Sequence, residues 1–336
     1  MDWNLIFENS LKGFVGINAV YFAIAALGLN VQFGYTGLLN FGQAGFMACG
    51  AYGLGMTAHY FDISFWWGIP IGILFSVALG LLMGIPTLRL RADYLAIVTI
   101  ASAEIIRLVV RSVTFKTYFG GSDGINGFSS SFRALGNDFG IEEAGEYGIW
   151  PFKFTGRELW VLIVGWLLVG LFGLVVYKLM KSPWGRVLKA IREDEDAVKS
   201  LGKNVYSYKM QSLILGGVLG TVSGMVLAVD RGSVQAENYS RDVTFYILTA
   251  LVLGGIAKVS GSIVGSMMFW GLFTFMDNFL RQVAQDPVSI GNFTIMKSTQ
   301  VGQLNYILIG ILLILLLVFR PQGVFGNRKE MAFDGH

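Results

Sequence analysis

Continuous apolar stretches recur along this chain and constrain its fold more than any other feature. Most are about 20 residues long, the length a helix needs to cross roughly 30 Å of hydrocarbon. They are continuous rather than alternating, so they predict helices and not the strands of a barrel. Hydrophobic residues make up 54% of the 336 residues and charged residues only 14%, which leaves more apolar surface than a soluble domain can bury. We therefore expect an all-α, polytopic helix bundle, with residues 1–336 forming a single integral membrane domain.

The apolar stretches divide into about nine candidate transmembrane helices. They cover residues 14–33, 38–58, 65–85, 94–113, 159–179, 210–229, 243–256, 263–280 and 304–319. The second is rich in glycine and the seventh is short, so either could be broken or re-entrant. A glycine-rich segment at residues 34–46 also has a weak echo at residues 254–269, too degenerate to establish the inverted repeat found in many transporters.

Lysine and arginine in the short connections set the predicted orientation, because cytoplasmic loops carry an excess of them. Eight basic residues lie between residues 178 and 209, and Arg320, Arg328 and Lys329 follow the last apolar stretch. In the polar stretch at residues 114–158, acidic side chains outnumber basic ones. We therefore place residues 181–207 and the C-terminus in the cytoplasm, and the loop at residues 114–158 and the N-terminus on the periplasmic side.

Residues 181–207 form a polar helical segment between two apolar stretches. Ser182 can cap the first free N–H groups of a helix, Pro183 has the φ of a first helical position, and Gly202 can end the helix in a left-handed conformation. The segment thus predicts one short helix, with pairs four residues apart at Arg192/Asp196 and Glu195/Lys199. Its narrow apolar stripe consists of Val187, Ala190, Ile191, Ala197, Val198 and Leu201. Such a helix offers a surface to another protein.

Three polar residues inside the predicted spans are candidates for lining a translocation path. Asn40 and Gln43 lie in the glycine-rich second span, where polar side chains must face other helices or water. Tight helix packing explains them as well as a path does. Glu104 lies in the fourth span, three residues from Arg107 on the same helical face. Arg107 and Arg111 are near the end of that span, where long basic side chains reach the interface.

Several classes of function lack the residues they need. No Gly-x-x-x-x-Gly-Lys-[Ser/Thr] sequence occurs, so this chain does not itself hold ATP in a P-loop. Cys49 is the only cysteine, and His59 and His336 are the only histidines, which leaves no basis for a metal site or a catalytic triad. The net charge of +3 gives no reason to expect nucleic acid. We expect a non-catalytic chain without cofactor or metal. An ion-coupled carrier remains an alternative, for which Glu104 is the candidate carboxylate.

Short motifs, spread in a fixed order from about residue 28 to about residue 325, resemble one known family. They are GYTGLLNFGQAGF at 34–46, GAY at 50–52, RLRADYLAIVT at 89–99, GGSDGI at 120–125, SPWGR at 182–186, AIREDEDA at 190–197 and FRPQG at 319–323. Together they resemble the membrane permeases of bacterial ABC importers, specifically the branched-chain amino-acid permeases of the LivM type.

The resemblance implies a subunit of an ATP-driven importer in the bacterial inner membrane. Its partners would be a second permease of the LivH type, two cytoplasmic ABC ATPases and a periplasmic substrate-binding protein. The implied cargo is leucine, isoleucine and valine or another small neutral amino acid. Related permeases move urea or short amides, which are the alternative substrates.

The resemblance also implies that the cytoplasmic segment carries a coupling helix seated on an ATPase. Carried over by position, this role falls to Ala190, Arg192, Glu193, Glu195, Ala197 and Gly202. The general importer pattern has Glu-Ala-Ala before a glycine. Here the triplet is Glu195-Asp196-Ala197 and the spacing to Gly202 is one residue longer, which leaves the docking register open.

Overall fold

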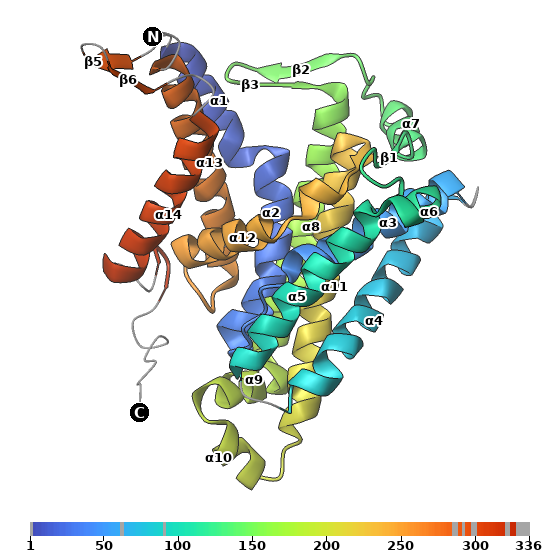
Figure 1. Ribbon diagram of the computed structural model, residues 1–336, viewed down its shortest axis with the longest axis vertical. Helices are drawn as coiled ribbons and strands as arrows, with labels where there is room; N and C mark the ends of the chain where they lie inside the picture. Colours follow the sequence, from blue (N-terminus) through green and yellow to red (C-terminus); the bar gives the residue numbers. More distant parts are fainter. Residues whose placement is uncertain are drawn as a thin grey trace.

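The computed structural model describes residues 3–60, 64–89, 92–283, 288–290, 293–296, 301–319 and 323–326. Over these residues the chain is a bundle of helices (Figure 1). Five helical segments are long and apolar enough to cross a membrane. The first, Trp3–Tyr35, comprises helix α1 (Trp3–Val15), helix α2 (Ile17–Leu29) and the π-helical turn η1 (Asn30–Tyr35). The second, Phe65–Thr87, comprises the 3-10 turn η2 (Phe65–Trp67) and helix α4 (Gly68–Thr87). The other three are the single helices α8 (Gly156–Lys181), α11 (Val205–Arg231) and α13 (Val259–Val283).

Burial separates the central helices from those at the periphery. In the most apolar window of α11, 83% of residues are buried, and the α1–η1 segment is 78% buried. The corresponding share is 33% in α4, α8 and α13. Large apolar side chains such as Leu82 and Leu167 therefore point outward from the peripheral helices. An apolar exterior of this kind suits a helix bundle in hydrocarbon.

The four other predicted spans coincide with helices that are shorter or more polar. They are α3 (Gln43–Tyr60), α5 (Ala92–Arg111), α12 (Arg241–Gly254) and α14 (Val301–Phe319). The second span, expected to begin at residue 38, is broken, because residues 37–42 have no regular structure and α3 starts at Gln43. The seventh is short, since the 14 residues of α12 extend only about 21 Å. The first helix, α1, begins before the first predicted span and overlaps it only at residues 14–15.

The polar stretch at residues 114–158 is folded. It contains η3 (Val113–Phe115), α6 (Lys116–Phe119), β1 (Ile125–Asn126), α7 (Ser130–Asp138), β2 (Glu146–Ile149) and β3 (Phe152–Thr155). β2 and β3 form a hairpin, while β1 pairs antiparallel with β4 (Ser233–Val234), which follows α11. A third pair is formed by β5 (Val288–Ile290) and β6 (Phe293–Met296). Three small two-stranded sheets, which the sequence analysis did not predict, therefore accompany a fold that is otherwise helical as expected.

The polar connections gather at two ends of the bundle. Helix α7 and the β2–β3 hairpin lie at the same end as the N-terminus, and α9 (Pro183–Glu193) and α10 (Glu195–Ser200) lie at the opposite end (Figure 1). Helices α8 and α11 run between these ends in opposite directions. Arg320, Arg328 and Lys329, on which the predicted position of the C-terminus depends, lie outside the described residues, as does Arg91 of the 89–99 motif.

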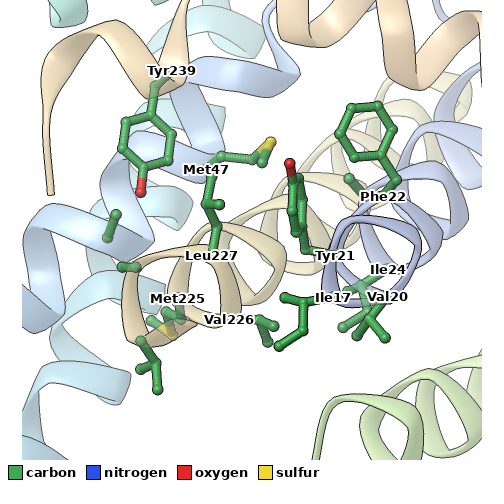
Figure 2. Close-up of a cluster of buried hydrophobic side chains, with 14 of the residues drawn as sticks. Ile17, Val20, Tyr21, Phe22, Ile24, Met47, Met225, Val226, Leu227 and Tyr239 are labelled. Carbon is green, nitrogen blue, oxygen red and sulfur yellow. The ribbon is translucent and has the colours of Figure 1, made fainter. Parts of the chain in front are cut away.

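The centre of the bundle is a close contact among α2, α3 and α11. Figure 2 shows Tyr21 and Phe22 of α2, Met47 of α3 and Met225 of α11 in one apolar cluster, with Tyr239 beside it. Glycines let the helix backbones approach closely enough to make this contact. A Cβ at Gly224 would lie 2.0 Å from the Met47 carbonyl oxygen, and one at Gly50 would lie 2.1 Å from that of Thr221.

We expect Gly224→Ala to lower the free energy of unfolding by about 1–3 kcal/mol, because the added methyl group overpacks the contact between α3 and α11. Thermal unfolding of the detergent-solubilised protein measures this effect. Gly170→Ala on α8 is the matched control, since a Cβ there meets nothing within 4 Å. Equal melting temperatures for the two variants would contradict the packing interpretation.

Candidate functional site

The segment at residues 181–207 folds as two helices, not as the single helix that we predicted. Pro183 is in the first turn of α9, and Gly202 adopts a left-handed φ of 74° after α10. Asp194 breaks the helix with an extended backbone, and its carboxylate accepts hydrogen bonds from the N–H groups of Asp196 and Ala197, which begin α10. Ser182 occupies the cap position of α9, but its hydroxyl donates to the Leu179 carbonyl instead of capping α9.

The break at Asp194 changes which side chains face outward. Leu188, Ile191 and Val198 are buried against the bundle, whereas Leu201 is 79% exposed. The predicted apolar stripe was therefore wrong for its exposed members Ala190, Ala197 and Leu201, and it missed Leu188. Charged side chains such as Asp196 and Lys199 are exposed as well. From the exposed residues we select five as the surface proposed for coupling and call them the coupling surface: Ala190, Glu193, Ala197, Leu201 and Gly202.

Glu195 faces its own subunit. Its carboxylate pairs with Lys199, as predicted, at 3.1 Å, and also with Lys209 on α11. Burial opposes ionisation of Glu195, but the hydrogen bonds from Lys209 and Lys199 outweigh it and hold the pKa of this carboxyl below its usual range. The side chain thus ties α10 to α11.

Arg192 also points inward, and its predicted pair with Asp196 is replaced by a contact with another helix. The Nη1 atom donates to the Gly34 carbonyl oxygen at 2.6 Å, while Nη2 contacts Glu193 at 2.8 Å. Only 10% of the side chain is exposed. On the preceding turn of α9, the Lys189 ammonium lies 5.6 Å from the centre of the Tyr35 ring. Two cationic side chains of α9 are therefore seated on η1.

Asn30, at the start of η1, makes a second contact that the sequence analysis missed. Its Nδ2 atom donates to the Lys258 carbonyl at 3.0 Å and to the Ser262 hydroxyl at 2.9 Å, and its Oδ1 atom accepts from the Ala257 N–H at 2.9 Å. These bonds join η1 to the turn between α12 and α13. The signal available in the sequence was a single asparagine inside an apolar span, because a buried amide there needs partners. Gly34, within the first segment of the weak glycine-rich echo, also lies close to this turn, because a Cβ there would be 2.9 Å from the Ala257 nitrogen.

Asn40 and Gln43 lie in a buried amide network beside the broken stretch at residues 37–42. Asn40 Nδ2 donates to Gln32 Oε1 at 2.8 Å and to Gln43 Oε1 at 3.2 Å, and its Oδ1 atom accepts from the Gly42 N–H. Gln43 Nε2 donates to the Gly216 carbonyl on α11 at 3.0 Å. Both side chains therefore bond to polar groups of the bundle itself.

Glu104 belongs to an ion-pair cluster where α5 approaches η4 (Ala236–Tyr239). Arg107 contacts the Glu104 carboxylate through Nη2 at 2.5 Å, as their spacing predicted, and the Glu237 carboxylate at 3.2 Å. Arg111 pairs with Glu237 at 3.0 Å. Glu104 is thus neutralised by a neighbouring cation. Among the described residues, no group of three or more His, Cys, Asp or Glu side chains could hold a metal ion.

Comparison with known proteins identifies a family that matches nearly the whole chain. The family described as "Branched-chain amino acid transport system / permease component" matches residues 14–317. The LivM permease of the high-affinity branched-chain amino acid transport system of Escherichia coli (strain K12) is 29% identical over 328 residues, covering 96% of this chain and 71% of that protein. The LivM permease of Salmonella typhimurium is 31% identical over 318 residues, covering 90% of this chain and 67% of that protein. The nucleoside ABC transporter permease NupC of Lactococcus lactis is 26% identical over 253 residues, covering 71% of this chain and 73% of that protein.

We expect Gln43→Met to cost about 1–3 kcal/mol of unfolding free energy, because it leaves one buried Asn40 N–H without its partner and removes the side-chain hydrogen bond to the Gly216 carbonyl. Unfolding in SDS, followed by tryptophan fluorescence, measures the change. Gln235→Met, at an exposed position, is the matched control and should shift the midpoint little. Two equal midpoints would show that the amide network does not stabilise the fold.

Proposed function

This chain belongs to the permease components of branched-chain amino acid transport systems, and on that premise we propose that it imports branched-chain amino acids as one membrane subunit of an ABC importer. ATP binding and hydrolysis then take place on two partner ATPases at the cytoplasmic end. A second permease of the LivH type completes the membrane part, and a periplasmic binding protein delivers the amino acid. In this arrangement the chain spans the inner membrane about nine times, with the N-terminus periplasmic and the C-terminus cytoplasmic.

The coupling surface is the observation that carries the proposal. It lies on two short helices at one end of the bundle, directly between the long helices α8 and α11 (Figure 1). Small side chains at Ala190, Ala197 and Gly202 permit close approach by a partner, and the exposed Glu193 and Leu201 add an acidic and an apolar contact. Of the six residues expected to engage an ATPase, Ala190, Glu193, Ala197 and Gly202 are on this surface. Glu195 and Arg192 act through contacts inside the permease.

We place the translocation path at the interface with the second permease, near Asn40, Gln43 and Glu104. Asn40 lies within the irregular residues 37–42 and Gln43 follows them, where the backbone can rearrange without breaking a helix. Glu104 lies on α5, whose outward side presents Ile97, Ile105 and Leu108. Such an apolar face suits contact with another membrane helix. The polar end at residues 114–158 and 230–242 then receives the binding protein.

The substrate is the finer part of the proposal. The similarity to LivM permeases favours leucine, isoleucine and valine, while the more distant nucleoside permease shows that relatives differ in cargo. Urea and short amides remain the alternative cargo. An ion-coupled carrier that works without ATPases is the alternative mechanism, and it would depend on Glu104.

We expect Ala197→Arg to reduce the amount of ATPase that copurifies with the permease about tenfold, equivalent to roughly 1.4 kcal/mol of binding free energy. The new guanidinium projects from the coupling surface and prevents close approach, while every ion pair of Glu195 stays intact. A pull-down of co-expressed ATPases from detergent-solubilised membranes measures the effect. Asn137→Arg, on α7 at the opposite end, adds the same side chain and should retain the ATPases.

Equal ATPase recovery for these two variants would exclude docking at the coupling surface. Absence of ATPase from the wild-type sample would count against the importer assignment itself. That second result would direct attention to Glu104 and to the carrier mechanism.

We expect proteoliposomes that hold the assembled complex, ATP inside and the binding protein outside to accumulate labelled leucine. An excess of unlabelled isoleucine or valine should suppress this uptake, while adenosine or urea should not. Omission of ATP is the control, and it should abolish uptake because the binding protein cannot drive accumulation. Leucine uptake driven by an ion gradient in vesicles that hold this chain alone would instead support the carrier.

A further inference from the structure

We propose that Arg192 and Asn30 form a transmission link that carries movement of α9 through η1 to the start of α13. The inference rests on the proposed function, because it assumes that α9 is displaced by an ATPase. It assigns both residues a positioning role within the permease. Arg192 was expected to contact the ATPase, and Asn30 had no predicted role.

The first step of the link is the seat of Arg192 on η1. The guanidinium donates a charge-assisted hydrogen bond to the Gly34 carbonyl, a group at the C-terminal end of the α2–η1 helix, where the helix dipole favours a cation. The side chain is nearly buried, so it cannot present its charge to another protein. Lys189, over the Tyr35 ring, adds a second attachment one turn earlier on α9. Any displacement of α9 therefore acts on η1.

Glycines make this seat possible. The Cβ of any residue at position 37 would lie 3.2 Å from Cγ of Arg192, and Gly37 has a left-handed φ of 75°. A Cβ at Gly34 would collide with Asn30 Oδ1 at 1.9 Å. Position 34 thus has to lack a side chain, because the Asn30 side chain occupies the space of its Cβ while Arg192 bonds to its carbonyl oxygen. The π-helical turn that holds these residues is a form often found at functional sites.

The second step is the set of hydrogen bonds between Asn30 and the turn that joins α12 to α13. Its amide uses both its donor and its acceptor groups there, on Ala257, Lys258 and Ser262. Ala257 has a φ of 60°, a left-handed conformation that a residue with a side chain adopts only when its surroundings enforce it. The hydrogen bond from its N–H to Asn30 is one such restraint. We therefore expect the turn between α12 and α13 to move with Asn30, because the conformation of the turn depends on the Asn30 side chain.

The final step is the rigid packing of this turn against its own helices. A Cβ at Gly254 would lie 1.8 Å from the Gly261 carbonyl, so α12 and α13 touch backbone to backbone at their junction. The N–H groups of Val324 and Phe325 bond to the carbonyls of Leu253 and Gly254 and complete the end of α12. Movement of the turn must therefore move the start of α13, and α13 packs further along its length against α1 and α14 (Figure 1). The link joins the coupling helices to the peripheral side of the bundle.

The test compares leucine transported with ATP hydrolysed in the reconstituted complex. We expect Arg192→Met to leave ATPase recovery and hydrolysis within about twofold of wild type and to lower transported leucine per ATP about tenfold, within the usual range of coupling between linked sites. Arg192→Lys keeps the charge and one donor, so it should fall between these values. Asn30→Ser, which is too short to hold the turn, should give the same loss of coupling from the other end of the link. Lys178→Met removes an exposed cation at the end of α8 and is the matched control.

Each outcome decides the proposal. Low transport per ATP in Arg192→Met and Asn30→Ser, with the ATPases retained, supports the link, and an unchanged ratio in either variant overturns it. Loss of the ATPases from Arg192→Met would assign Arg192 to docking and also overturn it. If Arg192→Met does not insert, Arg192→Lys and Asn30→Ser carry the same test. Failure of the wild-type complex to bind ATPases or to transport leucine is a distinct result, because it contradicts the proposed function.

Discussion

A backbone N–H or C=O group inside a bilayer has no water to bond, so it needs a hydrogen-bond partner within the protein. The architecture of this protein depends on which groups provide those partners where a helix is interrupted. The interruption lies at residues 37–42, between η1 and α3. Side chains supply the missing partners there: Thr99 accepts from the Phe41 N–H, Asn40 from Gly42, and Thr244 from Ala44. These partners come from α5, α12 and the broken stretch itself. The interruption is therefore stable only when the surrounding helices are assembled.

Close glycine contacts give the bundle a centre that has little freedom to deform. Helices α2, α3 and α11 pack with their backbones in near contact, so a small shift between them would produce steric overlap. Motion is easier where the chain is already irregular or where polar side chains hold elements together. Those places are η1 with its following stretch and the turn after α12. The hydrogen bonds of Arg192 and Asn30 thus lie where a change of conformation causes the least steric overlap.

The coupling helices combine two kinds of residue that their sequence does not distinguish. Small or protruding residues form the exposed coupling surface, whereas Glu195, Arg192 and Lys189 fasten α9 and α10 to α11 and η1. An external surface transmits force only if it is attached on its inner side. The Glu195–Lys209 pair suits this role, because removing one partner leaves the other charge partly desolvated. The segment is thereby both the proposed docking site and a fixed part of the permease.

The sequence by itself determined that this chain is a helical membrane protein, which family it resembles, and where the polar helical segment between α8 and α11 begins and ends. These conclusions depend on local properties: apolar length, the fixed φ of Pro183, the left-handed freedom of Gly202 and the order of short motifs. Tertiary structure decided that the second span is broken and that Asp194 divides the segment at residues 181–207. It also decided that Arg192 of α9 reaches η1 and that Asn30 of η1 reaches the turn between α12 and α13. Periodicity could not reveal the contacts of Arg192 and Asn30, because their partners are more than 150 residues away, at Gly34 for Arg192 and at Lys258 for Asn30. Only the folded chain brings such groups within hydrogen-bonding distance.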